Sequence, residues 1–527
     1  MTTDMPSSPI LPEVTAAGGL TIDLLFARQA RATPQAPALA DAGGEVAFTY
    51  GELFDRVSRL AAWLTGPAGL KPGDRFAVLA ENRTEYVELL LAAAMSGTIL
   101  AAINWRLAPP EVAHCLRLVE PGLIVASPRH AGLLDAAAVG DVPHLLFGPD
   151  FEAIATAGPV PDLPAVTGPE SGLVILYTSG TTGLPKGALI SHRAEIARAQ
   201  VMAIDHAIPP GRGFVAWAPL FHMVSADQVL GTLIRGGRVT VVDGYDPEAI
   251  IRVVAREKIG WLVLMPGMIE DFLNHLAAAG PIEPDVMVMG CMADLVPLAQ
   301  IQAVTRALNA PYLNSFGSTE TGAAPASAAV IGVGELPAGL SKRQSAGCAV
   351  RLVDWDDTEV PDGVPGEATI RSPSLFSGYW NNPEATAEDF RGGWFHMGDM
   401  FVRNPDGSLD FVDRRKYLIK SGGENVYPAE IERLILAGAD IREAVVVRAP
   451  DARWGEVPVA VVAAAPHVTR EDVLGRLHGR LARYKLPKAV VFLDYDAFPR
   501  STTGKIKRHD VETLLDSRGQ LKGDPAP

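Results

Sequence analysis

The stretch "LYTSGTTGLPKGALISH", residues 176–192, places hydroxyl groups, glycines and a single lysine between two apolar runs. A strand that ends in such a turn aims several backbone N–H groups at phosphate oxygens, and glycines let the backbone approach closely. Lys186 adds a positive charge, but it does not follow a glycine and no Ser or Thr follows it, so this is not a Walker loop. We therefore predict a phosphate-binding loop of another kind. Its other polar and glycine residues are Thr178, Ser179, Gly180, Thr181, Thr182 and Gly183.

The composition indicates a multidomain globular protein. Its 527 residues exceed one ordinary core, and its net charge of −15 argues against nucleic-acid binding because a phosphate backbone would be repelled. The three cysteines are scattered without metal-ligand spacing and no secretory signal is visible, which favours a cytoplasmic protein. The most apolar run, residues 86–103, contains Glu88 and is predicted to be a buried helix leading into a strand, not a membrane span.

Short β-branched runs alternate with helical patterns over most of the chain, which is typical of βαβ units with parallel sheets. One helix is expected to have Pro247 in its first turn and Asp246 as its cap. After about residue 350 the pattern changes to short strands joined by Gly, Pro and Asp turns. We predict an α/β fold with a large N-terminal body, residues 1–413, and a small α+β C-terminal lid, residues 414–527.

The loop "YTSGTTGLPKG" resembles the signature loop of the acyl-adenylate-forming superfamily, which includes acyl-CoA synthetases, peptide-synthetase adenylation domains and luciferases. Other motifs follow in the family's order, so that the resemblance spans roughly residues 20–510. It implies that Lys186 and its loop grip the β- and γ-phosphates of ATP, which leave as pyrophosphate, and that AMP is the group transferred.

The stretch "NSFGSTETG", residues 314–322, resembles the second core motif of this family. The resemblance places Glu320 as the carboxylate that holds Mg²⁺ and Thr319 at the α-phosphate. A hard cation between a carboxylate and a triphosphate removes their repulsion. Phe316 stands where the family commonly has a Tyr stacked on adenine. Further nucleotide contacts are implied for Gly290, Cys291, Met292, Ser315, Gly317 and Ser318.

The segment "VMGCMADLVP", residues 288–297, departs from the family's short "GGAPL"-like turn beside adenine, because it carries Met292 and Asp294. Two interpretations stay open. The segment forms a subfamily's adenine pocket, or the enzyme admits ATP poorly and mainly uses acyl-AMP made elsewhere.

The remaining motifs fall in the C-terminal part. In "WFHMGDM", residues 394–400, Asp399 resembles the carboxylate that accepts hydrogen bonds from two ribose hydroxyls, and Arg414 resembles an Arg on the ribose and phosphate side. Lys416 falls at the family's hinge, about which the lid rotates between half-reactions. Lys505, in "STTGKIKR", resembles the catalytic lysine that neutralises the carboxylate and the α-phosphate. The residues expected to line the pantetheine tunnel for coenzyme A are Lys420, Ser421, Gly422 and Gly423.

The stretch "PLFHMVSADQ", residues 219–228, separates members of the family. Amino-acid-activating domains resemble "FDxS" here, whereas Phe221 and His222 resemble the "FH" of acyl- and aryl-CoA ligases. We therefore expect a stand-alone, AMP-forming carboxylic acid:CoA ligase that uses ATP, Mg²⁺ and coenzyme A, also because little chain follows Lys505 for a carrier domain. The expected catalytic residues are Thr178, His222, Glu320 and Lys505, and the expected acyl pocket includes His222, Met223, Asp227 and Gly317.

The identity of the acid stays open between fatty, aryl and bulky alicyclic acids, and a homodimer is one option that the sequence leaves open. A luciferase-like oxygenase would share these motifs. A non-enzymatic nucleotide-binding homologue would be expected to lose residues such as Lys186, Glu320 or Asp399, and none of these is lost.

Overall fold

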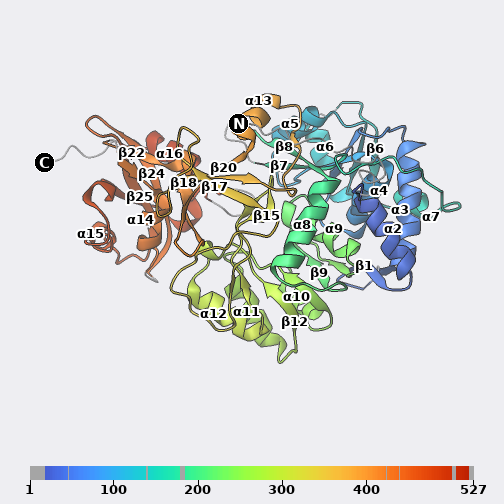
Figure 1. Ribbon diagram of the computed structural model, residues 1–527, viewed down its shortest axis with the longest axis horizontal. Helices are drawn as coiled ribbons and strands as arrows, with labels where there is room; N and C mark the ends of the chain where they lie inside the picture. Colours follow the sequence, from blue (N-terminus) through green and yellow to red (C-terminus); the bar gives the residue numbers. More distant parts are fainter. Residues whose placement is uncertain are drawn as a thin grey trace, which may run out of the picture. The chain divides into compact units, whose positions relative to one another are not determined.

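The computed structural model describes residues 18–44, 47–137, 140–178, 184–422, 424–437, 440–500 and 506–521. Contacts group the chain into two compact units, Met1–Ala349 with Arg371–Arg391, and Val350–Ile370 with Gly392–Pro527. Figure 1 traces both units along the chain. The boundary expected between residues 413 and 414 falls inside the second unit and remains a prediction.

The first unit contains a seven-stranded sheet whose central strands run parallel. The two pairings at one side of the sheet, β19 with β8 and β8 with β7, are antiparallel. Helix α5 (Pro109–Val119) packs Val112 and Cys115 onto the strand residues Ala77 and Ile124, which gives this sheet a dry face. In order, its strands are β19 (Gly378–Tyr379), β8 (Lys186–Ser191), β7 (Gly172–Thr178), β4 (Ile99–Ala102), β3 (Arg75–Leu79), β5 (Leu123–Ala126) and β6 (His144–Leu146).

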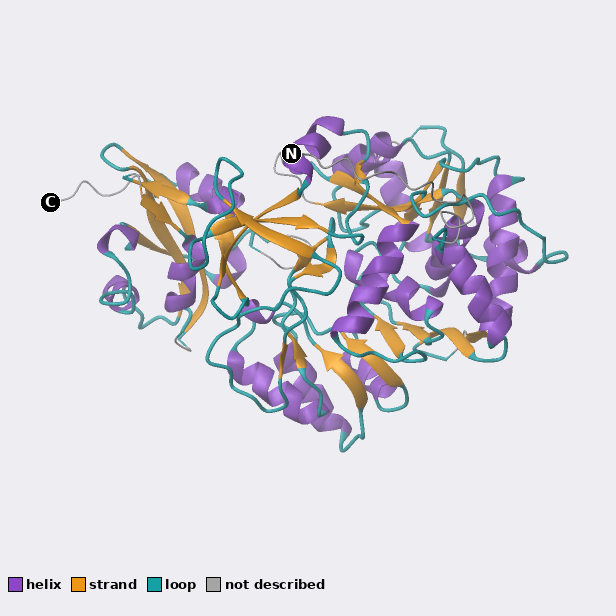
Figure 2. Ribbon diagram, viewed as in Figure 1, coloured by secondary structure: helices purple, strands orange, loops and turns teal. Residues whose placement is uncertain are grey.

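An eight-stranded sheet completes the core of this unit, and Figure 2 shows helices lying alongside the strands. Its strands are β16 (Val330–Ile331), β13 (Tyr312–Leu313), β12 (Asp285–Met289), β11 (Lys258–Leu262), β9 (Gly213–Ala216), β10 (Val239–Val241), β1 (Pro37–Asp41) and β2 (Ala47–Thr49). The unit's other main helices are α2 (Ile22–Ala32), α3 (Tyr50–Thr65), α4 (Thr84–Ser96), α6 (Ala131–Ala137), α7 (Pro149–Thr156), α8 (His192–Asp205), α9 (Met223–Ile234), α10 (Pro247–Val254), α11 (Ile269–Ala279), α12 (Leu298–Leu308) and α13 (Pro383–Asp389).

Two local predictions are confirmed here. The apolar run 86–103 forms α4 followed by β4, and Gly97 ends the helix in the left-handed conformation at φ 70°. Glu88 of α4 is fully buried but lies 2.7 Å from the Arg56 guanidinium, which explains a charged residue in an apolar helix. Asp246 caps α10 by accepting a hydrogen bond from the Ala249 N–H at 2.9 Å.

The second unit has two antiparallel-rich sheets. The first consists of β17 (Ala349–Val353), β18 (Gly366–Arg371), β20 (Phe395–Arg403) and β21 (Leu409–Arg414). The second consists of β23 (Glu424–Val426), β22 (Ile419–Ser421), β25 (Gly455–Ala464), β24 (Ile441–Asp451) and β26 (Ala489–Phe492).

Alternate residues of β24 face opposite sides of this second sheet. Val446 packs with α14 (Pro428–Ile435) and α15 (Arg470–Gly475), whereas Val445 and Val447 pack with α16 (Arg508–Ser517). The sheet is therefore covered by helices on both faces.

Candidate active site

The predicted phosphate loop connects two paired strands. Thr178 is the last residue of β7, Lys186 is the first of β8, and antiparallel pairing sets the two opposite each other. The pairing holds the two ends of the loop next to each other. The loop residues themselves, and two predicted residues of the second unit, lie outside the part of the chain that the structure describes, so their roles remain predictions. These are Ser179, Gly180, Thr181, Thr182, Gly183, Gly423 and Lys505.

Lys186 contacts two residues that the motifs do not identify, Tyr379 and Asp389, and Tyr379 in turn reaches Glu320 of the second motif. The Lys186 Nζ lies 3.6 Å from the centre of the Tyr379 ring and 3.8 Å from Asp389 Oδ2. The Tyr379 hydroxyl lies 3.0 Å from Glu320 Oε1 and 3.0 Å from the same Asp389 oxygen. We call these four residues, Lys186, Glu320, Tyr379 and Asp389, the Lys186 cluster.

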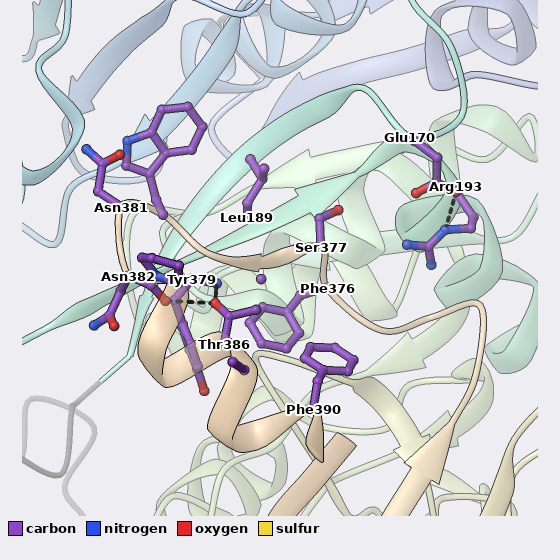
Figure 3. A pocket seen from close by; sticks show the side chains of 14 residues that line it. Glu170, Leu189, Arg193, Phe376, Ser377, Tyr379, Asn381, Asn382, Thr386 and Phe390 are labelled. Atoms are coloured by element: carbon purple, nitrogen blue, oxygen red, sulfur yellow. Dashed lines mark hydrogen bonds and ion pairs between the residues drawn. The ribbon is translucent and has the colours of Figure 1, made fainter. Parts of the chain in front are cut away.

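Strand pairing builds this cluster. Tyr379 of β19 pairs with Ala188 of β8, two residues from Lys186, so its ring reaches the lysine diagonally across the strands. The Tyr379 N–H donates to Thr386 Oγ1 at 2.9 Å, which ties β19 to α13, the helix that ends at Asp389 (Figure 3). The same strand and helix line a cavity of about 760 Å³ (Figure 3). Tyr379 therefore belongs both to the wall of this cavity and to the Lys186 cluster.

The cluster has a defined charge pattern. Burial, together with the carboxylates of Glu320 and Asp389, holds the pKa of Tyr379 well above its ordinary value. Burial also raises the pKa of Asp389, while the Tyr379 hydroxyl and Lys186 act in the opposite direction. Tyr379 is therefore a neutral phenol whose one proton is shared between two carboxylates, and Lys186 supplies a nearby positive charge.

The motif at 314–322 folds as a tight hairpin of β14 (Gly317–Ser318) and β15 (Gly322–Pro325). Any side chain at residue 317 would collide, since a Cβ there would lie 2.0 Å from the Gly322 carbonyl oxygen. The Glu320 carbonyl oxygen accepts from the Phe376 N–H at 2.8 Å. The Thr319 carbonyl oxygen accepts from the Arg198 guanidinium at 2.9 Å. Two neighbouring carbonyls are thus fixed, which orients the side chains of Thr319 and Glu320.

The adjacent segment at 290–294 is fixed just as firmly. The Tyr312 hydroxyl donates to the Cys291 carbonyl oxygen at 2.9 Å, and the Met292 N–H donates to Ser315 Oγ at 2.9 Å. Asp294 Oδ2 lies 2.5 Å from Nζ of Lys342, a lysine whose side chain is wholly buried. The departure from the family's turn therefore forms an ion pair between the exposed Asp294 and the buried Lys342. Asp294 compensates the charge of Lys342, and both interpretations of this segment remain predictions.

The segment predicted to line the acyl pocket is preceded by a turn that the Asn82 side chain holds through hydrogen bonds. The Asn82 amide nitrogen donates to the carbonyls of Ala218, of the two residues before it and of Val242. The Asn82 amide oxygen accepts from the Leu220 N–H, and together these bonds fix the turn before His222. His222 is the N-cap residue of α9, and its ring lies 5.4 Å from that of Phe221. Asp227 is buried and pairs with Arg198 at 3.1 Å. Its contact with the acyl group, and the roles of His222, Met223 and Gly317, remain predictions.

The second unit brings together Asp399 and Arg414. They are cross-strand partners in β20 and β21, and Arg414 Nε lies 3.0 Å from Asp399 Oδ1. The next carboxylate, Asp413, is buried and accepts from the N–H groups of Arg414 and Ala429 at 2.6 and 2.7 Å. These bonds fix the backbone just before Lys416, which is exposed in a short 3₁₀ helix.

The predicted CoA loop contains a glycine with a steric role. Gly422 has φ +61°, and a Cβ there would lie 2.6 Å from the Trp454 ring. Its N–H donates to the Trp454 carbonyl oxygen at 2.8 Å. Lys420, on the preceding strand, bonds through its N–H to Glu456 at 2.9 Å. The described part of this loop is therefore packed closely against the β24–β25 turn.

Sequence reasoning missed five residues that organise these sites: Asn82, Arg198, Lys342, Tyr379 and Asp389. An isolated Arg, Lys or Asp in a helical or turn segment ordinarily suggests a solvated charge. Their partners lie far away in the sequence, so no spacing rule connects them.

Comparison with known proteins agrees with this architecture. The model of the AMP-binding enzyme family matches residues 26–380, and that of the AMP-binding enzyme C-terminal domain matches residues 430–505. The chain belongs to the AMP-binding enzyme family.

The chain is 35% identical to a feruloyl-CoA synthase of Amycolatopsis, over 92% of this chain and 97% of that protein. An indoleacetate–CoA ligase of Aromatoleum aromaticum is 36% identical, over 89% of this chain and 93% of the relative. A long-chain-fatty-acid–CoA ligase of Mycobacterium tuberculosis is 32% identical, over 92% of this chain and 96% of that protein.

Solved structures show the same fold. A fatty acyl-CoA synthetase of Mycobacterium tuberculosis superposes with a TM-score of 0.75 at 29% identity, covering 95% of this chain and 98% of that one. The ATP-bound MatB of Rhodopseudomonas palustris superposes with a TM-score of 0.80 at 26% identity, and the match covers 95% of this chain and 100% of that one. The predicted superfamily, the α/β fold with a smaller C-terminal domain, and the AMP-forming acid:CoA ligase class are thereby confirmed. Among the helices that the structure describes, none is long and apolar enough to cross a membrane.

Proposed function

We propose that this acyl-CoA synthetase joins an aryl-substituted carboxylic acid to coenzyme A in two steps. A carboxylate oxygen attacks the α-phosphorus of ATP, and the bond to the leaving pyrophosphate breaks. The CoA sulfur then attacks the carbonyl carbon of the acyl-AMP, the bond to AMP breaks, and the thiol proton passes to solvent. The observation that carries the proposed adenylation step is the Lys186 cluster, in which Tyr379 contacts both the Lys186 ammonium and the carboxylate of Glu320 in the second motif.

In the first step, Lys186 and the hydroxyls of its loop, including Thr178, would bind the phosphates that leave. Thr319 would meet the α-phosphate and Phe316 would stack on adenine. Lys505 would neutralise the carboxylate and the α-phosphate as their oxygens approach. Fixed carbonyls at residues 319 and 320 support this assignment, because a preorganised loop loses little freedom when ligand binds.

The donor set fits Mg²⁺. Mg²⁺ prefers oxygen ligands and is usually held by one or two carboxylates together with substrate phosphates. Glu320 would supply such a carboxylate. Among the described residues no group of three His, Cys, Asp or Glu could hold a metal by itself, which suits an ion that arrives with the nucleotide. Bound there, Mg²⁺ would neutralise phosphate charge.

In the second step, the C-terminal domain would rotate about Lys416 and bring the loop of residues 420–423 to the pantetheine arm. Asp399 would hold the two ribose hydroxyls, with Arg414 beside it. Their 3.0 Å ion pair supports a shared task, since each side chain orients the other. We place the enzyme in the cytoplasm, where its thiols stay reduced, and retain a homodimer as its proposed assembly.

The aryl class of the acid is supported by the names of two relatives, feruloyl-CoA synthase and indoleacetate–CoA ligase. The fatty-acid ligase is also similar, so fatty acids are the competing class.

One panel tests both the reaction and the acid. Ferulate, indole-3-acetate and palmitate are each incubated with ATP, Mg²⁺ and CoA, and AMP, pyrophosphate and thioester are quantified. We expect one AMP and one pyrophosphate per thioester, with the aryl acids preferred. Preference for palmitate would overturn the acid class. Thioester formed from supplied acyl-AMP, with no pyrophosphate released from ATP, would instead favour an enzyme that depends on acyl-AMP made elsewhere.

A further inference from the structure

The ammonium of Lys186 already has an acidic partner within the protein. Asp389 Oδ2 lies 3.8 Å from Lys186 Nζ, and both side chains are largely shielded, with 21% and 29% of their surfaces exposed. A phosphate that binds this ammonium must share it with Asp389 or displace it. We propose that Asp389, held in place by Tyr379, competes with the phosphates for Lys186 and thereby promotes the release of pyrophosphate. This inference rests on the proposed role of Lys186 as a phosphate ligand.

Tyr379 gives Asp389 its position. The phenol donates to Asp389 Oδ2 and to Glu320 Oε1, each at 3.0 Å, while its ring face lies 3.6 Å from Lys186 Nζ. A single side chain therefore touches all three charged members of the Lys186 cluster. Because the Tyr379 N–H is tied to Thr386 in α13, the ring and Asp389 are held by the same short helix.

Helix stability does not account for an acid at this position. Asp389 is the last residue of α13, where the partial negative charge of the helix end disfavours a carboxylate. A partly buried carboxylate also loses hydration, which costs free energy unless partners compensate. Here the compensating partners are Tyr379 and Lys186, both in the Lys186 cluster. The position of Asp389 is therefore explained by its contacts with Tyr379 and with Lys186 at the end of the phosphate loop.

A balance between Lys186 and Asp389 would suit a reaction with a charged leaving group. Lys186 must bind the β- and γ-phosphates tightly enough to orient ATP, yet pyrophosphate must leave before the second half-reaction. A carboxylate that attracts the same ammonium weakens the binding of both ATP and pyrophosphate. Asp389 is then a positioning residue, because it acts through Lys186 and not on the reacting atoms.

The decisive variant is Asp389→Asn, which keeps an oxygen for the Tyr379 hydroxyl but removes the charge. We expect the KM for ATP and the inhibition constant of pyrophosphate each to fall about fivefold, the scale of a partly exposed ion pair. Turnover with saturating ATP should fall, because pyrophosphate leaves more slowly. The control is Glu388→Gln, which removes a neighbouring exposed charge from the same helix and should change neither constant. Asp389→Glu should restore the wild-type constants. Unchanged or raised constants in Asp389→Asn, at wild-type melting temperature, would overturn the proposal.

A double-mutant cycle separates this inference from the proposed function. Lys186→Met should greatly weaken adenylation, and adding Asp389→Asn to it should leave the inhibition constant of pyrophosphate unchanged. If Lys186→Met alone adenylates normally, the proposed role of Lys186 fails. If Lys186→Met is impaired but Asp389→Asn lowers the pyrophosphate constant equally with and without Lys186, the competition for Lys186 fails while the proposed function stands.

Discussion

The guanidinium of Arg198 donates a hydrogen bond to the Thr319 carbonyl oxygen at 2.9 Å, and its Nε donates to the Ser374 carbonyl oxygen at 3.0 Å. One buried side chain in α8 therefore fixes the second core motif and the segment that leads to Tyr379. Gly322 makes room for it, since a Cβ there would lie 2.7 Å from the Arg198 side chain. Asp227 supplies the opposite charge at 3.1 Å.

Replacing Arg198 by Met should strongly destabilise the first unit. The change leaves Asp227 buried without its cation and costs about 3–5 kcal/mol of unfolding free energy, as for other broken buried pairs. Urea unfolding measures this loss. The double variant Arg198→Met with Asp227→Leu should recover part of it, because both charges are then gone. A single variant as stable as the wild type would show that the pair does not hold this region.

Stability should fall in mild acid because of His192. This side chain is buried, its Nδ1 accepts a hydrogen bond from the Ile22 N–H at 3.1 Å, and Asp23 lies 3.9 Å away. Burial lowers the pKa of His192 to about 4, against the weaker opposing effect of Asp23. The unfolded chain therefore binds a proton near pH 6.5 that the folded chain does not, and stability is lost as pH falls from there toward 4.

The expected loss from His192 is about 2 kcal/mol between pH 7.5 and pH 5. His192→Asn keeps an acceptor for Ile22 but does not titrate in this range. Its unfolding free energy should therefore change less between these two pH values than that of the wild type. Equal changes in the two proteins would contradict the assignment.

Asp294 should matter for folding more than for ATP selectivity. Asp294→Ala leaves the buried ammonium of Lys342 without its carboxylate at 2.5 Å, so we expect a loss of about 2–4 kcal/mol in unfolding free energy. Adenylation by the folded fraction should not improve. Faster pyrophosphate release from ATP in this variant would favour the interpretation that the segment obstructs ATP.

Lys505 should serve only one half-reaction. Lys505→Ala should lower adenylation by about 10²–10³, the scale for loss of one preorganised electrostatic contact. Thioester formation from supplied acyl-AMP and CoA should be affected far less. Stopped-flow assays of each half-reaction give the comparison, and equal losses in both would mean that the role assigned to Lys505 is wrong.

The motifs predicted the fold well because each one needs a particular backbone. The run 86–103 could be resolved into α4 and β4, since Gly97 interrupts the helix and Glu88 argues against lipid. Asp246 and Pro247 predicted the start of α10, because capping depends only on neighbouring residues. Local chemistry of this kind is readable from sequence alone.

The Lys186 cluster was not readable in the same way. Its contacts depend on a two-residue strand, β19, that pairs with β8 in one register. Neither Tyr379 nor Asp389 stands in a pattern that points to Lys186. Arg198 and Lys342 were equally hidden, because a buried cation is stable only through carbonyls and carboxylates brought together by the tertiary fold.

The most direct test of the two-step reaction follows an oxygen atom. An acid labelled with ¹⁸O in both carboxylate oxygens is converted with ATP, Mg²⁺ and CoA, and the products are analysed by mass spectrometry. If the carboxylate attacks the α-phosphorus, each AMP carries one ¹⁸O atom and pyrophosphate carries none. Label in inorganic phosphate, or unlabelled AMP beside a formed thioester, would contradict adenylate formation by this enzyme.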